Sequence, residues 1–447
     1  MVQKFGGSSV ADEQGRFAAA QRVIATRHNG MCPVVVVSAM GRYGAPYATD
    51  TLITFANSIG PDVAKRELDL LMACGEIIST VVMAHTIRHL SGISTIAVTG
   101  GQAGIVTNWS FGSARIQRID PAYLVHCLER EKIPVVAGFQ GITEQDAHGV
   151  HGAVTTLGRG GSDTTATALG VALNAEAVEI YTDVDGVLTA DPDIVPHARS
   201  LPTISYEEIC EMAYLGAKVL HSRAAEMAMQ HELALWVKST KGKGRGTLIC
   251  QHWDSHDPRR VVTGVTHSGA VTPVTLHVSD ETDKPYVEHE LCRLLATADI
   301  PVYLISTTPT SISFVLDRAN VERLRAVLNA VVVPVKRPAE RGVRVYIVKV
   351  GAGSPTYEVQ RRMIENAPEM HPVTVNAGIG NEARIASLIG LGLQDTPGIV
   401  SRLARCLEQA GIEPIQTADS RISLSVLVSD AHASSAVSAL HREFIET

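Results

Sequence analysis

Two glycine-containing stretches hold the side chains best suited to chemistry, and the first lies near the N-terminus. Lys4-Phe5-Gly6-Gly7-Ser8-Ser9 follows a short apolar run and joins a lysine to two glycines and two hydroxyl groups. A lysine in such a turn can reach phosphate oxygens while the glycine amides surround them. The stretch does not have the Gly-x-x-x-x-Gly-Lys-Ser/Thr spacing of the common phosphate-binding loop. It predicts an anion-binding turn of another kind, placed directly after a strand.

The second stretch, Gly158-Arg159-Gly160-Gly161-Ser162-Asp163-Thr164-Thr165, stands directly before an apolar run with helical character. The free amides and the partial positive charge of a helix N-terminus favour a phosphate or carboxylate, and glycine lets the ligand approach closely. A surface turn capped by Ser162 or Asp163 would have a similar composition. The presence of two such stretches in one domain favours ligand binding.

The elements that must position these stretches alternate between strand and helix patterns from Met1 to about Lys238. The β-branched runs are Val34–Val37, Ile93–Val98, Val135–Ala137, Val178–Tyr181 and Leu235–Lys238. Continuous apolar strands separated by helices predict a mainly parallel α/β sheet with helices on both faces. Ligands bind such sheets at the carboxyl ends of the strands, which is where the glycine stretches lie.

A glycine-rich basic segment, Lys241-Gly242-Lys243-Gly244-Arg245-Gly246, reads as a linker or hairpin, and the domain boundary is expected between about 242 and 260. After it the pattern changes to short βαββα units that form an internal repeat. The predicted domains are an α/β domain over 1–245, a first repeat over 261–335, an extra partial βαβ segment over 336–380 and a second repeat over 381–447.

Composition restricts the class of protein. The 447 residues include 45% hydrophobic and 19% charged residues, and the formal net charge of -7 argues against bulk binding of nucleic acid. Seven single cysteines without a Cys-x-x-Cys pair predict small buried hydrophobic residues in a reducing compartment, with no zinc or other protein-bound metal site. The N-terminus has no signal-peptide pattern and the apolar runs are short. A cytoplasmic protein without a membrane partner is expected.

Val2 through Val10 resembles the signature of aspartate kinases in the amino-acid kinase family. The other matching segments follow in the family's order: Ser38-Ala39-Met40, Cys74-Gly75-Glu76, Gly138-Phe139-Gln140-Gly141, Gly158 to Thr165, Thr182-Asp183-Val184-Asp185-Gly186-Val187 and Gly216-Ala217-Lys218-Val219. The resemblance is dense up to the linker and looser beyond it, where the repeats look like ACT domains. It implies the amino-acid kinase fold followed by βαββαβ ACT-like regulatory domains.

The implied reaction transfers the γ-phosphoryl group of ATP, with Mg²⁺, to the β-carboxylate of L-aspartate. The product is 4-phospho-L-aspartate, the first intermediate toward lysine, threonine, methionine and diaminopimelate. The β-carboxylate is already ionised at neutral pH, so its attack needs no general base. What must be overcome is repulsion between two anions, which requires lysines, magnesium and oriented amides.

The resemblance also assigns the site residues. It gives catalytic roles to Lys4, Lys218 and Asp163, and aspartate-binding roles to Thr49, Glu76, Arg159 and Ser162. The residues assigned to ATP are Lys4, Phe5, Gly6, Gly7, Ser38, Gly160, Gly161, Thr182, Asp183, Leu188, Thr189, Ala190, Asp191, Pro192, Asp193 and Lys218. Arg159 can pair with the α-carboxylate at two points, and Glu76 with Asp163 can hold the α-ammonium. Taken singly, these residues also fit ordinary roles: Lys218, for example, would be a surface residue on a helix around Ala213 to Val219.

Two positions depart from the family pattern. Asp193 stands where an arginine usually follows Pro192, which puts a positive contact to the nucleotide in doubt. Ser222 stands where a proline is usual, and this is expected only to loosen a turn.

The C-terminal repeats imply feedback control by lysine, threonine or diaminopimelate, and at least a homodimer formed through the ACT domains. The effector residues expected in the second repeat are Asp395, Pro397, Gly398, Gln416 and Asp419, next to a helix predicted over Pro397 to Ala410. In the first repeat the corresponding loop, Ser279 to Pro285, is unusually acidic. The segment from Val343 to Val375, which the family's usual repeat pair lacks, could pack beside the dimer interface.

Two alternatives remain open at this point. The second repeat could be a purely structural dimerisation domain, because proline and glycine are common in ordinary turns. The whole chain could instead be a non-catalytic amino-acid sensor that binds a catalytic paralogue. The presence together of Lys4, Glu76, Arg159, Asp163 and Lys218 favours the enzyme.

Overall fold

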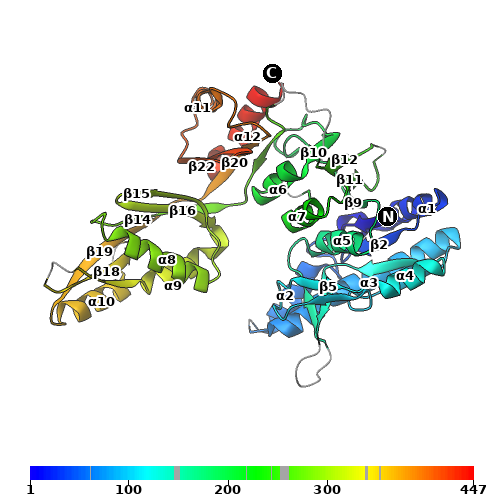
Figure 1. Ribbon diagram of the computed structural model, residues 1–447, viewed down its shortest axis with the longest axis horizontal. Coiled ribbons are helices and arrows are strands. Elements are labelled where there is room, and N and C mark those ends of the chain that lie inside the picture. The colour runs from blue at the N-terminus through cyan, green and yellow to red at the C-terminus, as the bar shows by residue number, and fades with distance from the viewer. Residues whose placement is uncertain are drawn as a thin grey trace. The chain divides into compact units, whose positions relative to one another are not determined.

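The computed structural model describes residues 1–60, 62–144, 152–217, 219–242, 244–251, 261–337, 341–351 and 354–446. It divides into two compact units, one of residues 1–264 with 389–392 and the other of residues 265–388 with 393–447. The first unit, coloured blue to green in Figure 1, continues past residue 245, where the sequence placed its end. The reason is β12 (Thr247–Cys250), which pairs antiparallel with β11 (Leu235–Ser239) and parallel with β10 (Thr203–Ser205).

The main sheet of the first unit has eight strands in the order β10-β12-β11-β9-β1-β2-β6-β3. The strands nearest the site are β1 (Val2–Phe5), β2 (Val34–Val37), β6 (Ile133–Ala137) and β9 (Val178–Thr182), with β3 (Thr95–Val98) at the edge. All of these pair in parallel, which confirms the predicted mainly parallel α/β sheet. Their carboxyl ends therefore lie along one edge of the sheet.

Helices cover both faces of this sheet, as alternating side chains of β2 show. Val35 and Val37 pack into a core with Val23 of α1 (Glu13–His28) and Met83 of α3 (Lys65–Ser91). Val34 and Val36 belong to the core on the other face. That core also contains residues of α5 (Gly161–Ala172), α6 (Tyr206–Tyr214) and α7 (Ser222–Gln230). Burial of both faces explains why β2 reads as an unbroken run of valines.

A smaller four-stranded sheet in the same unit supplies the chain that enters the second glycine stretch. Its order is β5 (Ile116–Ile119), β4 (Ile105–Thr107), β7 (Gln140–Thr143) and β8 (Val154–Thr156). The unit also contains α2 (Thr49–Ile59) and α4 (Ala122–Glu129). Because β8 ends at Thr156, the small sheet fixes the position of the glycines that follow.

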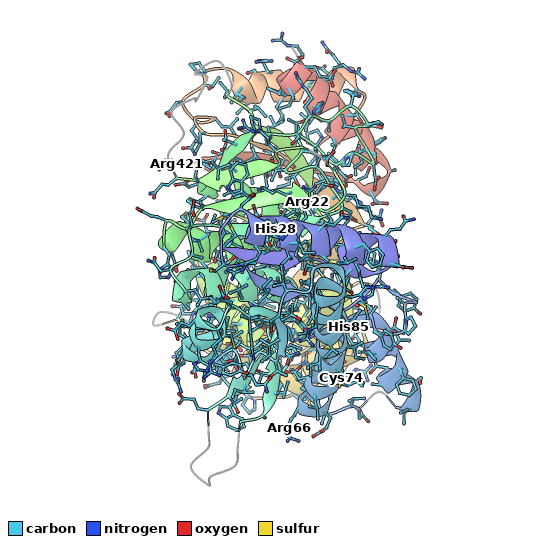
Figure 2. The ribbon with its side chains drawn as sticks, turned by 90° about the vertical axis from the view of Figure 1, so that its right-hand side faces the viewer. Arg22, His28, Arg66, Cys74, His85 and Arg421 are labelled. Atoms are coloured by element: carbon cyan, nitrogen blue, oxygen red, sulfur yellow. The ribbon has the colours of Figure 1, made fainter. Side chains whose placement is uncertain are left out.

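Helix α3 is the long helix of this unit, with 27 residues. By length and composition it could cross a membrane, but half of its most apolar window is buried within the protein. Figure 2 shows Cys74 and His85 along it, beside α1. Cys74 is exposed, as are Cys32 and Cys292, so the expectation of uniformly buried cysteines was wrong. The described residues contain only free cysteines.

The segment around Lys218 differs from the predicted helix over 213–219. Helix α6 ends at Tyr214, and α7 begins only at Ser222. Gly216 has a φ of 113°, which most residues avoid and which ends a helix. Lys218 itself lies outside the described residues, so its proposed role stays a prediction.

In the second unit the first repeat consists of β14 (Val271–His277), α8 (Lys284–Thr297), β15 (Tyr303–Thr308), β16 (Ser311–Asp317), α9 (Val321–Asn329) and β17 (Val332–Lys336). The segment between the two repeats forms β18 (Val343–Val350), α10 (Pro355–Glu365) and β19 (Met370–Ile379). Its two strands lie in the same sheet, where β18 pairs with β17 and β19 pairs with β14. This βαβ segment therefore widens the sheet of the first repeat, and that the family's usual repeats lack it stays a prediction.

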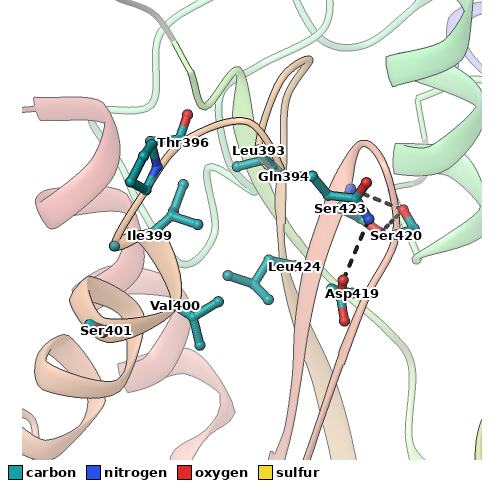
Figure 3. A pocket seen from close by; sticks show the side chains of 12 residues that line it. Leu393, Gln394, Thr396, Ile399, Val400, Ser401, Asp419, Ser420, Ser423 and Leu424 are labelled. Carbon is teal, nitrogen blue, oxygen red and sulfur yellow. Dashed lines mark hydrogen bonds between the residues drawn. The ribbon is translucent and has the colours of Figure 1, made fainter.

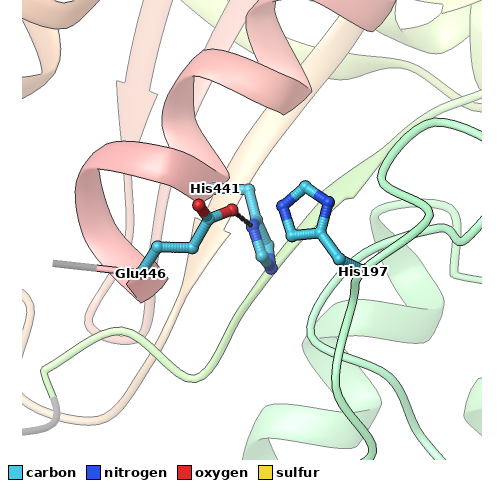
Figure 4. A group of neighbouring side chains, drawn as sticks. All are labelled: His197, His441 and Glu446. Carbon is cyan, nitrogen blue, oxygen red and sulfur yellow. Dashed lines mark hydrogen bonds and ion pairs between the residues drawn. The ribbon is translucent and has the colours of Figure 1, made fainter.

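The second repeat consists of β20 (Ala383–Ile389), α11 (Ile399–Gln409), β21 (Gln416–Asp419), β22 (Ser423–Ser429) and α12 (Ala433–His441), with β13 (Gly264–His267) beside β20. Strand β21 stands at the end of the sheet order. Beyond α12 the chain continues directly into a π-helical turn, Arg442–Glu446. The buried His441 ring lies 2.8 Å, through Nδ1, from the Glu446 carboxylate (Figure 4).

Candidate functional site

The turn after β1 explains the first glycine pair. The Gly6 amide donates to the Tyr181 carbonyl at 3.2 Å, which fixes the turn against β9. A Cβ on Gly7 would lie 2.5 Å from the Ala39 carbonyl oxygen, so only glycine fits there. Gly6 has more room, since its nearest neighbours, the Lys4 ammonium and the Tyr181 carbonyl, would be 3.7 Å from an added Cβ. The lysine is therefore folded over an open turn at the end of its own strand.

Lys4 and Asp163 bring the two glycine stretches together. The Lys4 ammonium lies 2.6 Å from Asp163 Oδ1, and each side chain is only 12% exposed. Asp163 belongs to the first turn of α5. The ion pair holds a cation at the carboxyl end of the central strand, close to the positive end of a helix.

The start of α5 is packed closely against His221 and Gly138. Gly160 caps the helix with a φ of 69°, and an added Cβ there would overlap the ring of His221. A Cβ on Gly138, which follows β6, would lie 2.8 Å from the Ser162 side chain. Burial lowers the pKa of His221, while the nearby Asp163 carboxylate opposes this. A neutral imidazole therefore supports the glycine turn.

Glu76 is a buried carboxylate for which the described residues provide no ion-pair partner. It is 2% exposed, and its Oε1 accepts a hydrogen bond from the Ala39 amide at 3.2 Å. Its Oε2 has no hydrogen-bond partner among the described residues. Burial raises its pKa to about 8, against the opposing hydrogen bonds from Ala39 and the Thr49 side chain. Such a group is suited to receive a cationic ligand.

Ala39 connects the two parts of the site. Its carbonyl packs against Gly7, its amide binds Glu76, and its Cβ lies within 3.0 Å of the Cβ position of Gly75. Arg159 is exposed, and the described residues give it no ion-pair partner. The arginine is thus free to pair with an anion from solution.

The end of β9 carries the residues predicted to contact the nucleotide. Thr182 Oγ1 donates to Asp183 Oδ1 at 3.0 Å, and Arg42 pairs with Asp183 Oδ2 at 2.8 Å. Arg42 was missed in the sequence, because 141 positions separate it from its partner. Arg42 supplies an exposed cation at this end of the sheet. A positive contact to the nucleotide was in doubt from the sequence, because Asp193 stands where an arginine is usual.

Several other residues assigned to ATP point into the protein. The Phe5 ring is buried and stacks on Tyr181 with centroids 4.7 Å apart, so only its backbone is available at the turn. Thr189 and Ala190 are buried as well. Asp193 is exposed, and its amide donates to Asp191 Oδ1 at 2.9 Å. The loop from Leu188 to Asp193 therefore has a buried first half and reaches the surface at Asp193.

Known proteins of one family are similar to this chain over its full length. The model of the amino acid kinase family matches residues 1–239, and an ACT domain model matches residues 387–444. Aspartokinase 1 of Bacillus subtilis is 38% identical over 99% of this chain and 98% of its own length. The aspartokinase of Mycolicibacterium smegmatis is 36% identical over 99% of this chain and 96% of its own length. The chain belongs to the aspartokinases of the amino acid kinase family.

The fold agrees with this assignment. A crystal structure of Escherichia coli aspartokinase III in complex with aspartate and ADP superposes with a TM-score of 0.73. The match covers 99% of both chains at 23% identity. The predicted amino-acid kinase fold followed by a C-terminal ACT domain is thus confirmed.

The second repeat of this aspartokinase contains a cavity of about 390 Å³ (Figure 3). It is lined by Leu393, Gln394, Thr396, Pro397, Gly398, Ile399, Val400, Ser401, Asp419, Ser420, Ser423 and Leu424. Of the expected effector residues, Pro397, Gly398 and Asp419 line it, whereas Asp395 and Gln416 do not. The Gln416 side chain instead donates to the Leu304 carbonyl at 2.7 Å.

The helix beside this cavity begins two residues later than predicted. Gly398 caps α11 with a φ of 79°, and the helix starts at Ile399 rather than at Pro397. The open first turn of α11 and the Asp419 carboxylate lie at different sides of the cavity (Figure 3). Such a cavity offers amide donors at one side and an anion at the other.

The corresponding loop of the first repeat is occupied by the chain's own side chains. Asp283 is 1% exposed and accepts from the Tyr346 hydroxyl at 2.7 Å and from Arg337 at 2.7 Å. Arg344 and Arg337 pair with Asp280 at 2.7 and 2.9 Å. Hydrogen bonds from Thr282 and the two arginines lower the pKa of Asp280. The unusual acidity of this loop is therefore matched by two internal cations, one of them on β18 of the extra segment.

The raised pKa of Glu76 predicts a pH dependence of aspartate recognition. Only the ionised carboxylate can hold an ammonium, and with a pKa of about 8 it is mostly neutral at pH 7. The KM for aspartate should fall as the pH rises from 6 to 8, by up to about tenfold per unit. Steady-state kinetics at saturating ATP checks this, and Glu76→Gln should show a raised, pH-independent KM. A constant wild-type KM over this range would exclude the ammonium role of Glu76.

Proposed function

We propose that this protein transfers the γ-phosphoryl group of ATP to the β-carboxylate of L-aspartate and forms 4-phospho-L-aspartate. The observation that carries the proposal is the buried Glu76 carboxylate, which has no cation among the described residues and is linked through Ala39 to the turn that follows Lys4. Full-length similarity to aspartokinases supports the same reaction. The product would begin the biosynthesis of lysine, threonine, methionine and diaminopimelate.

Recognition of aspartate would use its two α-substituents. The α-ammonium would bind Glu76, with Thr49 holding the carboxylate oriented, because no described residue supplies this buried anion with a cation. The free guanidinium of Arg159 would form a two-point pair with the α-carboxylate. Ser162, at the start of α5, would add a hydroxyl contact. The β-carboxylate is then the part of the substrate left free to react.

Transfer would occur at the carboxyl end of β1. The ionised β-carboxylate attacks the γ-phosphorus without a general base, and the Lys4 ammonium lies where negative charge spreads over the transferring group. Asp163 fixes the position of that ammonium through the 2.6 Å ion pair. Magnesium bound to ATP would neutralise part of the phosphate charge. Gly6, Ser38, Gly160, Gly161 and the Thr182–Asp183 end of β9 would surround the nucleotide, with Lys218 as a second lysine.

A non-catalytic sensor is the alternative. A sensor would not need a lysine held by a carboxylate at the end of the central strand, since it has no transition state to stabilise. The ion pair between Lys4 and Asp163 therefore favours an enzyme. Its substrates are small metabolites, and we expect it to work in the cytoplasm.

The Lys4→Met variant tests catalysis. Loss of a cation that acts on the transferring phosphoryl group should lower kcat by about 10²–10³, with a small change in the KM for aspartate. ATP-dependent formation of aspartyl hydroxamate measures the rate. Lys65→Met, which changes an exposed lysine at the start of α3, is the matched control and should keep wild-type turnover. Wild-type turnover in Lys4→Met would show that Lys4 has no part in transfer.

We further propose that lysine, threonine or diaminopimelate binds the cavity of the second repeat. The α-carboxylate would face the first turn of α11, and Asp419 would hold an ammonium group. The corresponding loop of the first repeat is less suited to an effector, because Asp280 and Asp283 are already paired with Arg337 and Arg344. Asp419 ends the edge strand β21, which would pair with a second copy of the chain in a homodimer.

Calorimetry with the three amino acids tests this effector site. One of them should bind with a stoichiometry of one per chain, and Asp419→Ala should weaken it at least about tenfold, because the charge pair with the ligand ammonium is lost. Glu408→Ala, an exposed change on α11, should bind like the wild type. Two effectors per chain, or unchanged affinity in Asp419→Ala, would contradict the assignment.

A further inference from the structure

Asp69 is a fully buried carboxylate of the first unit that sequence reasoning did not select. It lies on α3, seven residues before Glu76, and is 0% exposed. Seven residues correspond to almost two helical turns, so both carboxylates extend from the same side of α3. Burial of a charge is costly unless it is satisfied, and Asp69 is satisfied by groups distant in the sequence.

Three hydrogen bonds connect Asp69 to the small sheet. Its Oδ2 accepts from the Thr156 amide at 2.8 Å and from the Gly112 amide at 3.0 Å. Its Oδ1 accepts from the Thr156 hydroxyl at 2.8 Å. These partners are 43 and 87 positions away, so the carboxylate ties α3 to two other segments of the chain.

Both partners lie next to the turn that presents Arg159. Thr156 is the last residue of β8, three positions before the arginine. Gly158 has a φ of 76°, and a Cβ built on it would lie 3.3 Å from the Gly112 carbonyl oxygen. The two backbone amides held by Asp69 therefore belong to the two segments between which the Arg159 turn is packed.

The part of α3 that carries Glu76 is held in place as well. A Cβ on Gly75 would lie 2.6 Å from the Tyr47 carbonyl, so α3 cannot shift toward that loop without a clash. The Ala73 carbonyl accepts from Gln140 of β7 at 3.1 Å. Glu76 is thus held on a helix whose position relative to the small sheet is set by hydrogen bonds at Asp69 and at Ala73.

We propose that Asp69 is a positioning residue for aspartate recognition, which sets the separation between Arg159 and Glu76. The inference rests on the proposed function, in which these two side chains bind the α-carboxylate and α-ammonium of one amino acid. Those substituents are a fixed distance apart in the ligand, so a displaced turn would lose one of the two contacts. Among the described residues, the hydrogen bonds of Asp69 go to Gly112 and Thr156, which lie apart from the nucleotide end of β9 in the sequence.

The test compares Asp69→Ala with Asp69→Asn in the full-length protein. Asp69→Ala should raise the KM for aspartate about tenfold or more, with the KM for ATP within about twofold of the wild type. Asp69→Asn should recover most of the loss, because its amide oxygen can accept both backbone amides and its nitrogen can donate to the Thr156 hydroxyl. Recovery by the amide separates hydrogen-bonded positioning from a role of the charge.

Glu208→Ala is the matched control. Glu208 is also 0% exposed and accepts from Ser205 and Thr263, on the side of the unit formed by α6. It should lose thermal stability as Asp69→Ala does, with an unchanged KM for aspartate. If Asp69→Ala does not fold, as judged by circular dichroism, Thr156→Val decides in its place, because it removes one contact and keeps both backbone amides.

The outcomes are distinct. A KM for aspartate within about twofold of the wild type in Asp69→Ala, or in Thr156→Val where that variant decides, would overturn the inference. An equal rise in the KM for ATP, or an Asp69→Asn variant as impaired as Asp69→Ala, would also overturn it. A wild-type protein that forms no aspartyl hydroxamate would instead refute the proposed function.

Discussion

The burial of Glu76, with no cation beside it in the described part of the chain, is the constraint on which the site depends. Its pKa of about 8 means that, in the absence of ligand, the folded state binds a proton that the unfolded state has released. The proton's contribution to stability is fully present below the ordinary value of 4.5 and is lost as the pH rises through about 8. A ligand with an ammonium group can supply the missing charge. The protein thus gives up stability at neutral pH in exchange for a site that selects an amino acid.

The main sheet and α3 bring Glu76 together with the other residues of the site. Parallel strands bring Lys4 and the end of β9 to one edge, and α5 brings Asp163 to the same edge. Helix α3 brings Glu76 from the side, and Ala39 joins the helix to the phosphate turn. Each residue comes from a different part of the chain, so the geometry depends on the packing between elements. Loss of one such link displaces a contact without unfolding the core.

The sequence predicted what is decided locally and missed what is decided across the chain. The glycine stretches and the parallel strands were predictable, because valine runs and glycine turns act over a few residues. Helix ends were shifted where a glycine adopts a positive φ, as at Gly216 and Gly398. Asp69 and Arg42 were missed because their partners lie 87 and 141 positions away. The acidic loop of the first repeat, 279–285, likewise depends on Arg337 and Arg344, which come 54 and 64 positions later in the chain than the aspartates that they bind.

The most direct test of this account is the number of protons released when aspartate binds. Calorimetry at pH 7, with ADP present and in two buffers of different ionisation enthalpy, measures that number. With a pKa of about 8 in the free protein, Glu76 must lose its proton to hold the ammonium, so the release should approach one proton per aspartate. In Glu76→Gln any remaining binding should release none. Wild-type binding without proton release would contradict the claim that Glu76 receives the substrate ammonium.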